Sequence, residues 1–124
     1  MNEIVTETVV AEKIADNIVL VVAKEGVEIN AINAIQSNHI IEEAMGCNYG
    51  MIIDRKNDYS IDPVNVYQLL NTIERLKVIA LVLHKKSSMS LVSTEEHLFK
   101  GPLKAFTDLD AAIEWTKKQL LNFE

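Results

Sequence analysis

Two runs of β-branched residues open the sequence and predict consecutive strands. The runs cover residues 4–10 and 18–23, and Ala15-Asp16-Asn17 between them supplies turn-forming residues. We therefore expect a β-hairpin. The pattern leaves open whether this hairpin pairs within one subunit or between two subunits.

A helical period follows Gly26. Apolar residues recur at steps of three and four, as on a helix with one face against a core; they are Val27, Ala31, Ala34, Ile35, Ile41 and Met45. The spacing predicts a helix from about Glu28 to Met45 that is closed by Gly46. Asn38 continues this apolar stripe. Because an unsatisfied buried amide is costly, we expect Asn38 either to be partnered inside or to mark a subunit contact.

Two continuous apolar runs, residues 49–53 and 78–83, predict strands that are buried on both faces. Between them, Asp62 can cap a helix whose first position is Pro63, where the missing N–H costs nothing. Apolar residues at helical spacing then extend this predicted helix to about Arg75.

The last third of the sequence predicts a helix, an edge strand and a terminal helix. The first helix ends near Phe99 and has the weakest period of the chain. Gly101-Pro102 then ends the helical pattern. The next residues, Leu103-Lys104-Ala105-Phe106, alternate between apolar and polar positions as an edge strand would. Thr107 with Asp110 imitates a capping box for the terminal helix.

The predicted element order is ββαβαβαβα. Alternating helices and apolar strands predict an α/β fold with a mixed sheet and helices packed on it. A length of 124 residues, with 48% apolar and 24% charged residues, fits one globular domain spanning residues 1–124.

Charge and hydropathy narrow the classes of partner. The net charge of −6 repels phosphate backbones, so we expect no nucleic-acid binding. The apolar runs are far shorter than the roughly 20 residues of a membrane helix, so we expect no membrane insertion. The single cysteine, Cys47, cannot form an internal disulfide, which favours a cytoplasmic location.

The polar loop after the first buried strand is the most informative stretch of the sequence. Asp54, Asp58 and Asp62 recur every fourth residue in this loop, and carboxylates are the ligands that hard cations prefer. The central Gly and terminal Glu of a calcium loop are absent, and Arg55 and Lys56 offer the carboxylates cationic partners. We therefore predict a solvated loop, with Asp62 as a helix cap and no metal.

The second polar loop, Lys85-Lys86-Ser87-Ser88, opens a predicted helix, where backbone N–H groups can bind an anion. It lacks the glycines of a nucleotide loop, and a plain exposed turn is the stronger interpretation. If a small-molecule site exists, we expect it at this loop and at Tyr59 and Ser60, because parallel strands bring both loops to one edge of the sheet.

Nothing in the sequence forms a catalytic or cofactor-binding constellation. His39, His84 and His97 are far apart and lack the spacing of metal ligands, so we expect solvated or locally hydrogen-bonded rings. Cys47 has no activating base nearby in the sequence, and we predict a buried, inert thiol. We therefore expect that the protein is not an enzyme.

The element order, the Ile-Asp loop before a capped helix, and the ending Phe-Thr-Asp-Leu-Asp-x-Ala-Ile-x-Trp at residues 106–115 resemble the STAS-like (anti-sigma-factor-antagonist-like) domains. More particularly, the sequence looks like the small uncharacterised bacterial proteins of that fold. The resemblance covers nearly the whole chain in element order, and it implies a scaffold with a partner-binding role.

This sequence departs from one motif of the regulatory STAS-like proteins. Their loop after the third strand ends in an Asp followed by a phosphorylatable Ser and small residues. Asp62 matches that Asp, but Pro63 replaces the Ser, and Val64 and Asn65 replace the small residues. The phosphorylation switch is therefore not carried over.

Three hypotheses follow. The first is a regulatory or protein-interaction module, acting through a protein partner or as a small homo-oligomer. The alternative is a binding domain for a small anionic or apolar ligand, with Tyr59, Ser60 and residues 85–88 at the mouth of the site. The third, a hydrolase or transferase using Asp54 and Asp62, requires these carboxylates to converge with His84 or a metal.

Overall fold

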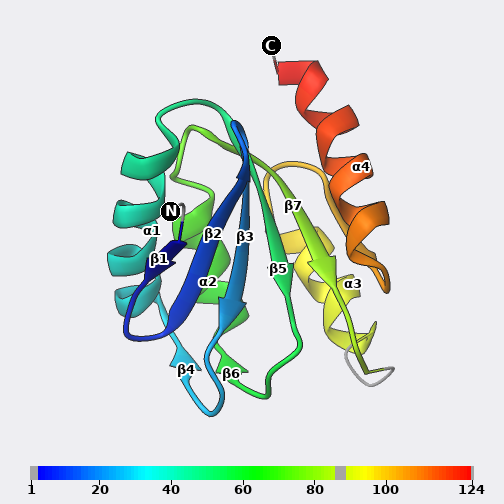
Figure 1. The fold of residues 1–124 in the computed structure, drawn as a ribbon. Helices are drawn as coiled ribbons and strands as arrows, with labels where there is room; N and C mark the ends of the chain where they lie inside the picture. Colours follow the sequence, from blue (N-terminus) through cyan, green and yellow to red (C-terminus); the bar gives the residue numbers. More distant parts are fainter. Residues whose placement is uncertain (1–2, 86–88, 124) are drawn as a thin grey trace.

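The computed structural model describes residues 3–85 and 89–123 and shows a twisted sheet with helices on both faces (Figure 1). The main sheet has the order β1 (Glu3–Val5), β2 (Val9–Ala15), β3 (Ile18–Ala23), β5 (Tyr49–Asp54), β7 (Leu76–Val82) and β8 (Leu103–Phe106). A small second sheet pairs β4 (Glu28–Ile29) with β6 (Ser60–Ile61). The helices are α1 (Ala31–Met45), α2 (Pro63–Leu70), α3 (Met89–Leu98) and α4 (Leu109–Leu120), and a short 3₁₀ helix, η2 (Leu121–Phe123), follows α4.

The main sheet is mixed, which confirms the predicted fold class. β1, β2 and β3 are antiparallel, whereas β3, β5, β7 and β8 run parallel. The N-terminal hairpin joins this sheet within the chain, because β3 pairs with β5 from Ile18 opposite Gly50 to Val21 opposite Ile53. No helix of the described residues is both long and apolar enough to cross a membrane.

The predicted first strand, residues 4–10, is in fact two strands separated by a turn. The hydroxyl of Thr6 accepts hydrogen bonds from the backbone N–H groups of Val9 (3.0 Å) and Thr8 (3.3 Å). These bonds compete with strand pairing and hold the turn. The second strand then continues to Ala15.

Helix α1 begins after Asn30, later than predicted. The segment Glu28–Ile29 is extended because it pairs with Ser60–Ile61 in the second sheet. Asn30 and Asn33 form a capping box, in which each side-chain oxygen accepts from the other residue's backbone N–H at 3.0 Å. Gly46 ends the helix with φ 65°, in the left-handed region that glycine tolerates.

Helix α2 ends at Leu70 rather than near Arg75. The side chain of Asn71 donates to the Leu98 carbonyl at 2.9 Å and accepts from the Lys100 N–H at 2.8 Å. These long-range bonds tie the end of α2 to the end of α3, so the chain turns there.

The cap of helix α4 is Asp108, not the predicted Thr107. The Asp108 carboxylate accepts from the backbone N–H of Ala111 at 3.3 Å. The predicted helix therefore starts one position later than the capping-box pattern suggested.

The sheet separates two apolar cores. Helices α1, α2 and α3 cover one face, and α4 covers the other (Figure 1). On β5, Met51 and Ile53 point to the first face and Ile52 to the second. A Cβ on Gly50 would lie only 2.5 Å from Cγ2 of Thr116, so α4 packs directly on the bare backbone of β5.

Candidate functional site

The two polar loops meet at the carboxyl edge of the parallel strands. Asp54 at the end of β5 places Oδ1 2.6 Å from Nε2 of His84, which follows β7. The next residue, Lys85, forms an ion pair with Asp58. The hydrogen bond from Lys85 to the carboxylate of Asp58 raises the pKa of the Lys85 ammonium. The two polar loops are therefore neighbours, as we expected from parallel strands that end at the same edge of the sheet.

The three carboxylates of the first loop do not converge. Their partners are His84 for Asp54, Lys85 for Asp58 and Asn65 for Asp62. Asp62 caps α2 as predicted, and its Oδ2 accepts from the Asn65 amide at 2.6 Å. The hypothesis of a hydrolase or transferase required Asp54 and Asp62 to converge with His84 or a metal. In the structure, Asp54 contacts His84, whereas Asp62 is bonded to Asn65. In the described part of the chain, no three His, Cys, Asp or Glu residues group in a way that could hold a metal ion.

The remaining predicted site residues separate. Tyr59 is partly buried and lines an internal cavity. Ser60 is exposed on β6, where its backbone N–H donates to the Val27 carbonyl at 3.0 Å. Lys86, Ser87 and Ser88 lie outside the described residues.

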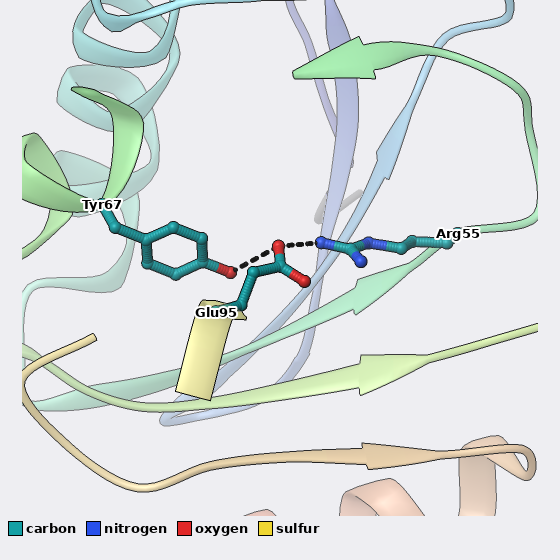
Figure 2. A network of polar contacts seen from close by, with 3 residues as sticks. All are labelled: Arg55, Tyr67 and Glu95. Atoms are coloured by element: carbon teal, nitrogen blue, oxygen red, sulfur yellow. Dashed lines mark hydrogen bonds and ion pairs between the residues drawn. The ribbon is translucent and has the colours of Figure 1, made fainter. Parts of the chain in front are cut away.

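A buried polar cluster lies behind the loop edge. Figure 2 shows the carboxylate of Glu95 between the hydroxyl of Tyr67 and the guanidinium of Arg55. Oε1 of Glu95 accepts from Tyr67 at 3.0 Å and from Nη2 of Arg55. The side chains of Arg55 and Glu95 are 7% and 0% exposed, so this is a buried ion pair.

Three different elements position this cluster. Arg55 follows β5 in phase with Met51 and Ile53, so strand alternation directs it to the face covered by α1, α2 and α3. Tyr67 belongs to the buried face of α2. Glu95 lies on α3 between the buried residues Val92 and Phe99, at helical spacing.

Burial and charge shift the pKa values of the cluster. Burial raises the pKa of Tyr67, and the negative charge of Glu95 raises it further. Burial acts to lower the pKa of Arg55, but the hydrogen bond and charge of Glu95 outweigh it and leave that pKa raised. Burial also raises the pKa of Tyr59, although Arg55 opposes this effect. At neutral pH Arg55 is therefore charged and both phenols are neutral.

The cluster borders a partly open cavity of about 70 Å³ between α1, α2 and the sheet. Its wall is mostly apolar and includes Val21, Ala34, Ile41, Met51, Val66 and Leu70. Its polar members are Thr8, Ser37, Asn38, Arg55, Tyr59 and Tyr67. Such a lining suits a small apolar molecule with a polar group.

Helix α1 buries most of the predicted stripe, including Ala34, Ile41 and Met45, but it differs from the prediction at two positions. Ser37 and Asn38 are buried at 6% and 8% exposure, whereas Ile35, predicted for the core, is 45% exposed. Spacings of three and four residues from Ala34 to Ile41 select the buried face, and Ile35 falls outside it. The polar residues Ser37 and Asn38 therefore line the cavity.

Asn38 is only half satisfied. Its Nδ2 donates to the Ala34 carbonyl at 3.1 Å, while its Oδ1 is buried and has no hydrogen-bond partner among the described residues. Nε of Arg55 and Oε2 of Glu95 are likewise buried without a partner there.

The sequence reasoning missed Arg55 and Glu95 as interior residues. Glu95 carried a signal, because it sits on the i, i+3, i+7 stripe with Val92 and Phe99. Arg55 also continued the alternation of the strand before it. Arg55 was expected to pair with the carboxylates of its own loop, but its partner is Glu95, 40 residues away in the sequence.

The prediction of a buried Cys47 is wrong. Cys47 follows the cap of α1 in an exposed position, and its thiol contacts the Asp16 carbonyl at 3.5 Å. His39 and His97 are exposed on α1 and α3.

Comparisons with known proteins bear on the fold. No protein-family model matches this chain, and no curated protein sequence matches it significantly. A solved structure from Shewanella loihica PV-4, an uncharacterised protein of the DUF3478 family with a SpoIIAA-like fold, is similar with a TM-score of 0.60 and 15% identity. The match covers 87% of this chain and 91% of that one. At this identity the likeness shows the fold alone, and this chain therefore has the SpoIIAA-like, STAS-like fold that its element order predicted.

Proposed function

We propose that this protein is a non-enzymatic binding domain for a small apolar molecule, held in the cavity between α1, α2 and the sheet. The observation that supports this proposal is the cavity itself, about 70 Å³ in volume and walled mostly by apolar side chains of both helices and of strands from the two sheets. Tyr59, one of the residues expected at the mouth of a ligand site, lines this cavity, which supports the ligand-binding hypothesis.

Filling the cavity contributes to the binding of an apolar molecule. A cavity costs stability at about 24 cal/mol per Å³. A space of about 70 Å³ therefore leaves roughly 1.7 kcal/mol that an apolar ligand can recover. Larger apolar cavities, of about 150 Å³, bind benzene or xenon.

Xenon is a suitable first probe because it has no polar groups. We expect a saturable shift of the Ile41 and Met51 methyl resonances when the protein is titrated with xenon. Filling the space with Ala34→Leu should abolish this shift. Ala44→Leu, at an exposed position of the same helix, should leave it intact. A wild-type protein without a saturable response, or an unchanged response in Ala34→Leu, refutes the proposal.

A second candidate function is self-association through the outer face of α1, as expected of a protein-interaction module. Ile32, Ile35 and Ile40 are 72%, 45% and 47% exposed on that helix. Burying these side chains against a second copy of the chain removes apolar surface from water. The phosphorylation switch of regulatory STAS-like proteins plays no part, because Pro63 occupies the first position of α2.

Sedimentation velocity over a range of concentrations tests this second function. We expect a concentration-dependent dimer that Ile32→Lys abolishes. Leu121→Lys, which removes an apolar side chain that is 63% exposed on η2, should have no effect. A monomer at all concentrations, or equal effects of both variants, rejects self-association through α1.

A further inference from the structure

The cavity wall carries an unused acceptor. Asn38 is 8% exposed, its amide nitrogen is occupied by the Ala34 carbonyl, and its Oδ1 is buried without a partner among the described residues. Leaving a buried acceptor unpaired costs about 1 to 3 kcal/mol. A ligand that donates a hydrogen bond to this oxygen recovers part of that cost.

Two of the neighbouring polar groups, Ser37 and Arg55, are already engaged with protein partners. The hydroxyl of Ser37 already contacts the hydroxyls of Thr6 (3.1 Å) and Thr8 (3.3 Å). The charge of Arg55 is balanced by Glu95, and its Nε is buried without a hydrogen-bond partner among the described residues. Oδ1 of Asn38 is therefore a free acceptor on the cavity wall, and Nε of Arg55 is a free donor whose charge is already balanced by Glu95.

Charge balance separates the classes of ligand. A carboxylate can accept from Arg55, but it brings a buried negative charge close to Glu95 and cannot donate to Asn38. A hydroxyl group both donates and accepts, and it carries no charge. A molecule with no polar group leaves both protein atoms unpaired.

We propose that the cavity selects a neutral, hydroxyl-bearing apolar molecule, such as a short-chain alcohol, whose hydroxyl donates to Oδ1 of Asn38. This inference rests on the proposed ligand-binding function and names the class of its ligand. With about 70 Å³ available, the cavity encloses only a short chain, and a longer chain extends through its open side.

Three probes with matched chains test the inference: 1-pentanol, 1-chloropentane and pentanoate. Binding is followed by two-dimensional NMR of the full chain, using the side-chain amide of Asn38 as a local reporter. For the wild-type protein we expect 1-pentanol to bind at least as tightly as the more apolar 1-chloropentane, and pentanoate to bind most weakly. We also expect 1-pentanol to move the Asn38 amide resonances further than 1-chloropentane does.

The variant Asn38→Leu removes the acceptor while nearly keeping the side-chain volume. It should weaken 1-pentanol about tenfold, since one buried hydrogen bond contributes on the order of 1.4 kcal/mol, and it should not weaken 1-chloropentane. Gln36→Leu, at an exposed position of the same helix, should change neither affinity. If Asn38→Leu fails to fold, the ranking of the three probes by the wild-type protein tests the hydroxyl inference instead.

The outcomes distinguish the two proposals. Equal effects of Asn38→Leu on both neutral probes, or tightest binding by pentanoate, overturn the hydroxyl inference and leave the ligand-binding function standing. If none of the three probes binds to the wild-type cavity, the proposed function itself falls.

Discussion

The buried ion pair makes a quantitative prediction about stability. Replacing Arg55 with methionine removes a cation whose side chain is 7% exposed and leaves the carboxylate of Glu95, at 0% exposure, with only the hydroxyl of Tyr67 as a partner. Removing one partner of a buried pair typically costs about 3 to 5 kcal/mol, because the remaining charge is neither solvated nor neutralised. We expect Arg55→Met to lower the free energy of unfolding by that amount.

Urea denaturation at neutral pH measures this loss, with the fluorescence of Trp115, the single tryptophan, as the signal. For a domain of this size the slope of the free energy against urea is on the order of 2 kcal/mol per molar. A loss of about 4 kcal/mol therefore moves the unfolding midpoint down by roughly 2 M urea.

Two further variants separate the charge effect from a loss of packing. The double variant Arg55→Met with Glu95→Leu removes both charges, and we expect it to be far more stable than Arg55→Met alone. Lys85→Met removes a cation from an ion pair whose lysine side chain is 56% exposed, and it should barely move the midpoint. If Arg55→Met costs no more than Lys85→Met, the reasoning about a desolvated pair is refuted.

Three other predictions follow from individual contacts. Gly101→Ala should lower the melting temperature by several degrees, because the added Cβ would lie 2.4 Å from the Lys77 carbonyl oxygen; an unchanged melting temperature in calorimetry contradicts that contact. Above pH 10 the free energy of unfolding should fall, by up to about 1.4 kcal/mol per pH unit for each of the three tyrosines. Burial raises the pKa of each above 10.0, so the unfolded chain loses its phenol protons before the folded chain does. Urea titrations at pH 9 and pH 11 measure this decline, and equal stability at both refutes it. Asp62→Ala should cost about 0.5 to 1 kcal/mol in chemical denaturation by removing the cap of α2, whereas Asn65→Ala, which keeps that carboxylate, should cost less.

The sequence determined the features that depend on neighbouring residues. Continuous apolar runs specified the buried strands β5 and β7, because a strand that is covered on both faces has apolar residues at successive positions instead of alternating with polar ones. Asp62-Pro63 specified where α2 starts, and Gly46 specified where α1 ends, because capping and left-handed backbone are local matters. The order of these elements, together with the Ile-Asp loop and the motif at residues 106–115, carried the resemblance that predicted the STAS-like fold.

Tertiary structure alone decided which polar residues lie inside. Arg55 and Glu95 are 40 residues apart, and each is tolerated in the interior only because the other neutralises it. The cavity and the free oxygen of Asn38 arise where two helices and the sheet meet, and no single segment encodes that space. Local patterns cannot report a compensation that forms only when distant segments pack together, so the sequence predicted the scaffold, whereas the buried ion pair and the cavity became visible only in the tertiary structure.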